Sequence, residues 1–493
     1  MQLKKIAALV AVTCAGLAGN AHAAMTPAHA AVIDGAATRV FYISGASATQ
    51  AGFTEIINAM FVPASVIRLA NTTASSKDYE AVAGTLAAGT GPWAGQTAII
   101  IDRVKGGSVM GVNPVARAEA IETLIVTSAT CGASGAGTAA SPYTCDLSDG
   151  SEAKPHKVPD AGISDVAPGL FQSPFNTEGE TPAEALNATE LAQFANKVYN
   201  KPIYALAFGV PVTNNTNVAL NRAAVAAIMT GNVGTWNQVS STLPADDIVV
   251  CRRVQGSGTQ AVDNLHFGNY PCSSDFNVPA ARDASGAWDG VNYTVTGTEG
   301  GLVVIENSTS GDVRNCLTAA ANPDGATYAT KDRDGHAVTV TFEPKVGGHR
   351  AIGVLSMDSV GSSNAAGAWS FRSLDGAGTV TCTGTCPATT APVLSGTGTF
   401  PTQANLMNGS WDLQGWVSWN VPVRTQGNAA KAGLASRFVA VAQNPTIIAG
   451  LNNLKHTAAA LPTPFSPYSG ANVMKAAYLG GSQCAPLNRN SAP

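Results

Sequence analysis

Short β-branched runs alternate along the chain with segments whose apolar residues recur at helical spacing. One run, residues 203–212, is apolar throughout and lies between Pro202 and Asn214, which is typical of a strand buried on both faces. We predict strands over 39–43, 97–103, 203–212, 247–252 and 347–355. We predict helices over 51–60, 182–199, 220–230 and 429–451, and another that begins near Thr259. This alternation predicts an α/β chain.

Three polar, glycine-rich stretches interrupt this alternation and predict inserted loops, at residues 132–155, 275–345 and 359–404. The second holds strand-like pieces at 293–295, 302–305 and 338–342. Its Asp332 to Gly335 segment lacks the full ligand spacing of a calcium loop, so we expect a hairpin turn there. The third suits a surface loop or a small β-ribbon. Downstream of it, core and interface packing is the expected role of Trp411, Trp416 and Trp419.

A glycine- and hydroxyl-rich turn follows the strand at 247–252 and reads Arg253-Val254-Gln255-Gly256-Ser257-Gly258-Thr259. The first N–H groups of a helix are unpaired and carry the positive end of its dipole, so a turn at this point suits an anion. Two hydroxyls add donors, and an upstream guanidinium can bind two oxygens. The alternative is that Ser257 merely caps the helix.

Three further turns carry related chemistry. Residues 44–50 form a small-residue turn between a strand and a helix. The strand at 97–103 leads into a Gly-Gly-Ser turn that ends at Ser108. Asp165 follows a small-residue turn and precedes a proline, where the backbone can hold its carboxylate. The alternative for Asp165 is an ordinary turn or N-cap aspartate.

The N-terminus has the pattern of a secretory signal peptide over residues 1–23. Lys4 and Lys5 precede an apolar run too short to span a bilayer, and Ala21-His22-Ala23 is a small-x-small cleavage site. No later stretch has the length and hydrophobicity of a membrane span. The formal net charge is −4 at pH 7, which argues against non-specific nucleic-acid binding. We therefore expect a periplasmic or extracellular protein.

Eight of the nine cysteines lie beyond this leader, and an even number in an exported chain predicts disulfides. Proximity in sequence suggests the pairs Cys131–Cys145, Cys251–Cys272 and Cys382–Cys386, which leaves Cys316 with Cys484. Metal binding is the alternative for the CxxxC pair, but no histidine lies near it.

Four segments, in order along the chain, resemble the phosphate-binding proteins of phosphate ABC transporters. Residues 45–49 are similar to the family's Gly-Ala-Gly-Ala-Thr turn. Residues 162–168 resemble its Gly-Ala-Ser-Asp-Ala-Pro segment, with one residue inserted before the proline. Residues 230–237 match Thr-Gly-x-x-x-x-Trp-Asn, and residues 252–259 resemble Arg-Arg-x-Asp-Gly-Ser-Gly-Thr. The resemblance extends from about residue 41 to residue 355.

This resemblance implies a two-lobed type II periplasmic binding fold, in which each lobe is a sheet flanked by helices and the polar stretches are additions. Lobe 1 would comprise residues 38–203 and 350–493, and lobe 2 residues 204–349, with hinges near Tyr204 and Arg350. The implied ligand is inorganic phosphate or a related oxyanion, the implied partner is an ABC transporter permease, and the protein would be a monomer without cofactor or metal. The implied ligand-binding residues are Thr49, Ser108, Asp165, Arg253, Ser257, Gly258 and Thr259.

Two positions depart from the family pattern. Gln255 stands where the family has an aspartate that pairs with the arginine, and Gln50 stands where an aromatic residue is usual. The aspartate at 165 is retained. A carboxylate can accept the proton of hydrogen phosphate, and sulfate has no such proton at neutral pH. We therefore expect Asp165 to select phosphate over sulfate.

Two other functions compete with anion capture. A hydrolase would need an activated nucleophile, but Ser47, Ser257 and Ser363 lie in no Gly-x-Ser-x-Gly elbow, and the histidines beyond the leader show no triad or metal spacing. We therefore expect no enzymatic activity. The third possibility is a secreted or surface protein that uses the fold as a scaffold, with the inserted loops as its working surface.

Overall fold

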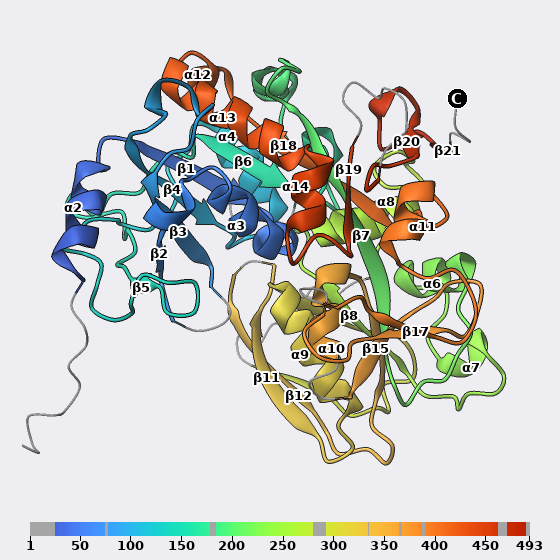
Figure 1. The fold of residues 1–493 in the computed structure, drawn as a ribbon. Helices are drawn as coiled ribbons and strands as arrows, with labels where there is room; N and C mark the ends of the chain where they lie inside the picture. The colour runs from blue at the N-terminus through green and yellow to red at the C-terminus, as the bar shows by residue number, and fades with distance from the viewer. Residues whose placement is uncertain are drawn as a thin grey trace, which may run out of the picture.

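The described chain forms two lobes, and one hydrogen-bonded sheet of 16 strands continues from one lobe to the other, with helices packed on it in each lobe (Figure 1). The predicted two-lobed α/β class is therefore confirmed. The signal peptide predicted over residues 1–23 lies outside the described part, and none of the helices within that part is long and apolar enough to cross a bilayer. The computed structural model describes residues 25–73, 77–177, 184–279, 292–333, 335–363, 367–386, 390–461 and 471–489.

The first lobe is built around three parallel strands, with two more added in antiparallel order. These strands are β6 (Ala161–Ser164), β1 (Val40–Gly45), β4 (Thr97–Arg103), β3 (Tyr79–Thr85) and β2 (Ile67–Ala70). Side chains alternate across the sheet. Phe41 and Ile43 pack in the core that contains α3 (Gln50–Asn58) and α13 (Ala429–Ala442). Tyr42 joins the opposite core, beneath α2 (Pro27–Gly35).

The second lobe also has a parallel core, with β8 in the middle. Its strands are β10 (Val303–Asn307), β8 (Ile248–Arg253) and β13 (Arg350–Gly353). The helices around them are α6 (Arg222–Met229), α8 (Gly258–Gly268) and α9 (Ser310–Ala321). Helix α9 packs on β8 and β13, and its buried residues Val313 and Leu317 face them. A small sheet beside this core consists of β11 (Ala326–Lys331), β12 (Ala337–Phe342) and β9 (Asn292–Val295).

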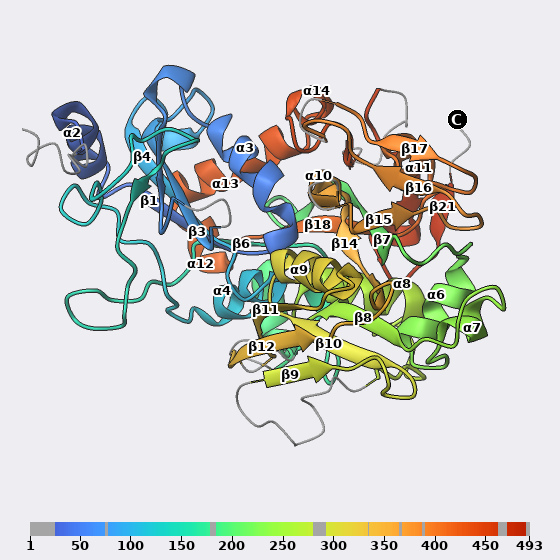
Figure 2. The same cartoon turned by 90° about the horizontal axis from the view of Figure 1, so that it is seen from below.

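One long strand, β7 (Lys201–Thr213), joins the two lobes (Figures 1 and 2). Its first half pairs with β18 (Gln414–Asn420), which also pairs with β6 of lobe 1. Its second half pairs with β15 (Trp369–Arg372) and touches β13 of lobe 2. The interior of β7 is buried throughout, as its apolar sequence predicts. The division of the chain at residues 204 and 350 stays a prediction.

The inserted stretches follow the sequence prediction in outline. Within the described part of residues 359–404, β15, β16 (Thr379–Thr381) and β17 (Val393–Ser395) form an antiparallel ribbon. β11 and β12 pair as a hairpin across the expected turn, of which Asp334 lies outside the described residues. The tryptophans at 411, 416 and 419 are all buried, which confirms their packing role.

Two of the four predicted disulfides are wrong. Cys131–Cys145 and Cys382–Cys386 form as predicted, but the other four cysteines pair as Cys251–Cys316 and Cys272–Cys484. Cys251 lies on β8 and Cys316 on α9, which covers that strand. Cys272 follows α8, and the C-terminal segment returns to meet it. Both pairings depend on how distant segments pack, so proximity in sequence predicts the wrong partners.

The helix predicted over 182–199 is also wrong in extent. The described part of this stretch has only α5 (Ala188–Leu191), followed by the 3₁₀ turn η6 (Ala192–Phe194). Asn187 caps the start of α5. Downstream, the Asn196 side chain accepts from the Val198 N–H at 3.0 Å. This local hydrogen bond competes with helical pairing and favours a turn.

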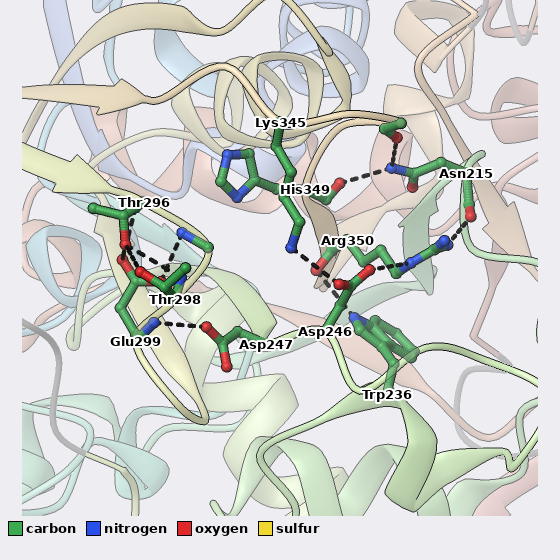
Figure 3. A network of polar contacts seen from close by, with 12 residues as sticks. Asn215, Trp236, Asp246, Asp247, Thr296, Thr298, Glu299, Lys345, His349 and Arg350 are labelled. Atoms are coloured by element: carbon green, nitrogen blue, oxygen red, sulfur yellow. Dashed lines mark hydrogen bonds and ion pairs between the residues drawn. The ribbon is translucent and has the colours of Figure 1, made fainter.

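A polar network at the base of lobe 2 gives the Thr-Gly-x-x-x-x-Trp-Asn segment a structural role (Figure 3). Trp236, at the start of α7 (Trp236–Val239), is fully buried, and its indole N–H donates to the Arg350 carbonyl at 3.1 Å. The Asp246 carboxylate pairs with Arg350 at 2.8 Å and with Lys345 at 3.1 Å. These contacts attach α7 to β13, so the segment stabilises the lobe.

Candidate functional site

The carboxyl ends of the parallel strands in the two lobes meet at one place. In lobe 1, β6, β1 and β4 lead into Asp165, the turn at 46–49 and Ser108 respectively. In lobe 2, β8 leads into the turn at 254–257, and β10 leads into the start of α9. In α/β folds the crevice beyond the carboxyl ends of the strands is the usual ligand site. The structure places the predicted site residues there.

Direct contacts hold the loops of the two lobes together. The Val109 N–H, in the 3₁₀ turn η4 (Ser108–Gly111), donates to the Gly256 carbonyl at 3.0 Å. A Cβ added to Gly258 would lie 2.2 Å from Ser108 Oγ and 2.4 Å from Asp165 Oδ2. Only glycine permits this approach, so the structure shows the lobes closed on each other.

Asp165 is buried at the floor of the site. The Ser108 hydroxyl donates to Asp165 Oδ2 at 3.2 Å, and the Asp165 N–H lies 3.2 Å from the same hydroxyl oxygen. Asp165 Oδ1 is also buried and has no hydrogen-bond partner in the described structure. Burial raises the pKa of Asp165 to about 7, although the nearby Arg253 and the Ser108 hydroxyl oppose the shift and Asp358 adds to it. One carboxylate oxygen is therefore available to a hydrogen-bond donor.

Arg253 is a buried cation that links the two lobes. Its Nη1 donates to Ser47 Oγ of lobe 1 at 3.2 Å and to Ser310 Oγ at 3.1 Å. Its Nη2 and Nε donate to the carbonyls of Ser308 (2.7 Å) and Asn307 (3.3 Å). Burial lowers the pKa of Arg253 to about 10, against the pull of Asp165 and Asp312. The guanidinium therefore stays charged at neutral pH and has a fixed orientation.

Ser257 and Thr259 carry buried hydroxyls with no hydrogen-bond partner among the described residues. Ser257 occupies the N-cap position of α8, yet its side chain makes no capping hydrogen bond. The alternative that Ser257 caps the helix through its side chain is therefore wrong. An unpaired buried hydroxyl costs roughly 1–3 kcal/mol. Two such groups at the start of an eleven-residue helix indicate a site that receives a hydrogen-bonding ligand.

In the turn at 46–49 of lobe 1, by contrast, the threonine hydroxyl is hydrogen-bonded within the protein. Thr49 is buried, but its hydroxyl donates to the Ala46 carbonyl at 3.0 Å. The Gln50 side chain turns away to donate to the Lys77 carbonyl at 2.6 Å. The buried side chain of Gln255 lies in the second-lobe turn. The Ser47 hydroxyl, rather than that of Thr49, is the one that meets Arg253.

Two residues of the site lie outside the predicted set. Ser47 lies two residues before Thr49 in the same 3₁₀ turn, η1 (Ser47–Thr49), and the sequence offers it only as a candidate nucleophile. Ser310 begins α9 inside the polar stretch at 275–345, which the sequence presents as an insertion. The sequence does contain a pattern that could identify Ser310, because the strand β10 is followed by Ser-Thr-Ser-Gly at the start of a helix. That is the same strand, turn and helix pattern as the turn after β8.

Together these groups can hold a tetrahedral oxyanion. Two hydroxyls and the first N–H groups of α8 supply donors. The Arg253 guanidinium, which already makes four hydrogen bonds within the protein, contributes mainly its positive charge. The Asp165 carboxylate supplies one acceptor, which suits an oxyanion that carries a proton. Within the described residues, no three His, Cys, Asp or Glu side chains gather in a way that could hold a metal ion.

Comparisons with known proteins give one domain-family match and several similar solved structures. Residues 166–367 match the family model described as a PBP superfamily domain, which confirms the predicted relationship to binding proteins for that segment. A putative phosphate ABC transporter substrate-binding protein with bound phosphate from Clostridium perfringens is similar at a TM-score of 0.40 and 13% identity, over 84% of this chain and 98% of that one. A phosphate-binding protein from Stenotrophomonas maltophilia gives a TM-score of 0.37 and 13% identity, over 84% and 86%. No curated protein matches the chain.

Proposed function

We propose that this chain is an exported, non-enzymatic solute-binding protein that captures phosphate, or a similar oxyanion, between its lobes for uptake by an ABC-type permease. The observation that carries the proposal is the convergence of three unpaired buried oxygens beside a buried arginine. These oxygens belong to Ser257, Thr259 and Asp165, and the charge belongs to Arg253. Such a set costs stability unless a ligand completes it.

The energetics of anion capture agree with this arrangement. A dianion that leaves water must recover its solvation from many donors at once. Hydrogen bonds to charged groups contribute roughly 1.5–3 kcal/mol each, so five to ten convergent donors suffice. The two hydroxyls, the helix N–H groups and Arg253 form such a set around one point. The contacts between the lobes exclude water from it and keep the local dielectric low.

Asp165 gives the site its selectivity. When ionised, its free oxygen accepts a hydrogen bond from the hydroxyl group of hydrogen phosphate or hydrogen arsenate. Sulfate offers no proton, so its oxygens would face the carboxylate without a hydrogen bond. The charge of Arg253 nearby offsets part of the repulsion between Asp165 and the ligand.

Calorimetric titration of the phosphate-stripped mature protein tests the proposal, with phosphate, arsenate and sulfate run in parallel at pH 8. We expect tight binding of phosphate and arsenate and no measurable heat with sulfate. A matched control is Arg314→Gln, which removes a cation that binds Ser359 rather than Asp165 or Ser257 within the described residues, so phosphate affinity should change little. Absence of heat with all three anions contradicts the proposal and favours the scaffold alternative. Turnover of a phosphate ester would favour a hydrolase.

A further inference from the structure

A cavity lies next to Ser47 and Ser310, the two serines that bind Arg253. Residues of α3, α9 and α10 (Val360–Ser363) line it, and Figure 2 shows these three helices near one another. Its volume is about 350 Å³. It is lined by Ser47, Ala48, Gln50, Lys77, Asp78, Val104, Thr309, Ser310, Gly311, Arg314, Ser356, Asp358, Ser359 and Ser362.

Two serines connect this cavity to Arg253, which lies behind them and does not itself line the cavity. Ser47 and Ser310 line the cavity, and both accept hydrogen bonds from Arg253 Nη1, at 3.2 and 3.1 Å. Asp165, on the other side of the guanidinium, is close enough for the Arg253 charge to lower its pKa. An anion held at Arg253 would therefore lie close to the Ser47 and Ser310 hydroxyls, which line the cavity.

The position of Gln50 keeps the cavity open. Its side-chain amide donates to the Lys77 carbonyl at 2.6 Å and to Glu80 Oε2 at 3.3 Å. These bonds hold the amide against the wall rather than across the space.

The cavity wall has the chemistry of a hydroxyl-binding surface. Serine hydroxyls dominate it, and the Asp358 and Asp78 carboxylates add acceptors. Arg314 adds a cation whose Nη1 donates to Ser359 Oγ at 3.3 Å. Donors and acceptors thus lie side by side, which suits a group whose hydroxyls both donate and accept. No aromatic side chain lines the cavity among the described residues, so the cavity offers no ring on which a nucleotide base could stack.

The size of the cavity points to a small organic group. One water occupies about 30 Å³ of liquid, so the space corresponds to roughly ten water-sized groups. Orthophosphate has only five heavy atoms, and under the proposed function it binds at the Ser257 and Thr259 hydroxyls, outside this cavity. The cavity also lies within the usual range for small-molecule sites, about 300–1,000 Å³.

We propose that the ligand is a phosphate monoester of a small polyol or sugar, with its phosphoryl group at Arg253 and its hydroxylated part in this cavity. The proposal rests on the proposed function, because the phosphoryl group occupies the same anion site.

Titration calorimetry on the full mature chain tests this inference, with orthophosphate, glycerol 3-phosphate and glucose 6-phosphate as probes. The titrations are run at pH 6.5, between the second pKa of a phosphate monoester, about 6, and the pKa of Asp165, about 7, so that one proton can be shared between the ester and the carboxylate. We expect at least one ester to bind roughly tenfold more tightly than orthophosphate, which is about 1.4 kcal/mol.

A variant that fills the cavity tests whether the organic part of the ester binds there. Ser362 is exposed at the cavity wall and is not one of the anion-site residues. In Ser362→Trp the indole fills the cavity, so we expect ester affinity to fall roughly tenfold while orthophosphate affinity stays unchanged. Ser241→Trp is the matched control, since Ser241 is an exposed serine away from the cavity.

The outcomes separate this inference from the proposed function. Orthophosphate binding with equal or weaker ester binding overturns the inference and leaves phosphate capture intact. Ester affinity that Ser362→Trp leaves unchanged, or a loss of both ligands in that variant, overturns the assignment to this cavity. If no phosphate compound binds, the proposed function fails together with the inference.

Discussion

The turns that follow β1 and β8 have nearly the same composition but do different work. Each joins a parallel strand to a helix and contains glycine, serine and threonine. After β8, the hydroxyls of Ser257 and Thr259 are buried and unpaired. After β1, the Thr49 hydroxyl is bound to Ala46, and Ser47 accepts from Arg253. The second-lobe turn is therefore a donor surface for a ligand, whereas the first-lobe turn braces the arginine.

The glycines of the two turns show the same contrast. Gly45 has φ +142°, and a Cβ there would lie 1.8 Å from the Ile163 carbonyl of the neighbouring strand β6. Gly258 has ordinary helical geometry, but its missing Cβ makes room for Ser108 and Asp165 of the other lobe. Glycine at 45 thus serves packing within lobe 1, and glycine at 258 serves closure between the lobes.

Gly258→Ala should have the largest effect on binding. The added methyl must displace Asp165 or force the lobes apart, so several charged hydrogen bonds to the anion are lost together. At roughly 1.5–3 kcal/mol each, loss of two of them lowers phosphate affinity on the order of a hundredfold or more. Alanine suits a helix start, so the fold should persist. Calorimetry gives the affinity, and thermal unfolding gives the stability.

Two further glycine variants sharpen that experiment. Gly45→Ala clashes within a single lobe, where opening the cleft brings no relief, so it should lower stability first. Gly169→Ala is the neutral control, because nothing lies within 4 Å of the added Cβ. Unchanged phosphate affinity in Gly258→Ala would contradict the closed arrangement of Asp165 against α8.

Asp165→Asn should remove the discrimination between phosphate and sulfate. The asparagine carries no negative charge and can donate to an unprotonated oxyanion, so sulfate affinity should rise and approach that of phosphate. In the parent protein, sulfate should bind better below pH 7, where Asp165 is protonated, and should be rejected above it. Titrations with both anions at pH 6 and pH 8 measure this change. Sulfate rejection at pH 8 in the variant would contradict the assigned role.

The same substitution also has a stability signature. Folding raises the pKa of Asp165 from 3.8 to about 7, so the folded protein binds this proton more tightly than the unfolded chain does. This contribution to stability is fully present below about pH 4 and is lost as the pH rises through 7. At 1.36 kcal/mol per pKa unit the loss is about 4 kcal/mol. The asparagine side chain does not ionise, so the variant does not undergo this loss. Urea unfolding should therefore show that the free energy of unfolding of Asp165→Asn rises relative to that of the parent between pH 5 and pH 8.

Local sequence predicts much of this molecule, and long-range packing decides the rest. β4 and β7 follow from continuous β-branched or apolar runs, and the β8 turn follows from its glycines. Cys251 pairs with Cys316 because α9 covers β8, which spacing along the chain does not encode. Ser310 belongs to the site because β10 lies parallel to β8. Likewise, the pairing of each hydroxyl depends on which backbone carbonyl the fold brings beside it, so the sequence presents Thr49 and Thr259 as equivalents.

Thr259→Val and Thr49→Val test that last difference directly, since the same nearly isosteric change is made in both turns. Thr259→Val removes a donor to the anion, so phosphate affinity should fall about tenfold, or roughly 1.5 kcal/mol. It also removes an unpaired buried hydroxyl, so the free energy of unfolding without ligand should rise by about 1 kcal/mol. Thr49→Val breaks the hydrogen bond to Ala46, so stability should fall by about 1 kcal/mol, and affinity should fall less than in Thr259→Val. Equal effects of the two variants on affinity and stability would show that the turns share one role. If Thr259→Val raises the free energy of unfolding and Thr49→Val lowers it, the Thr259 hydroxyl in the β8 turn is the one that binds the ligand.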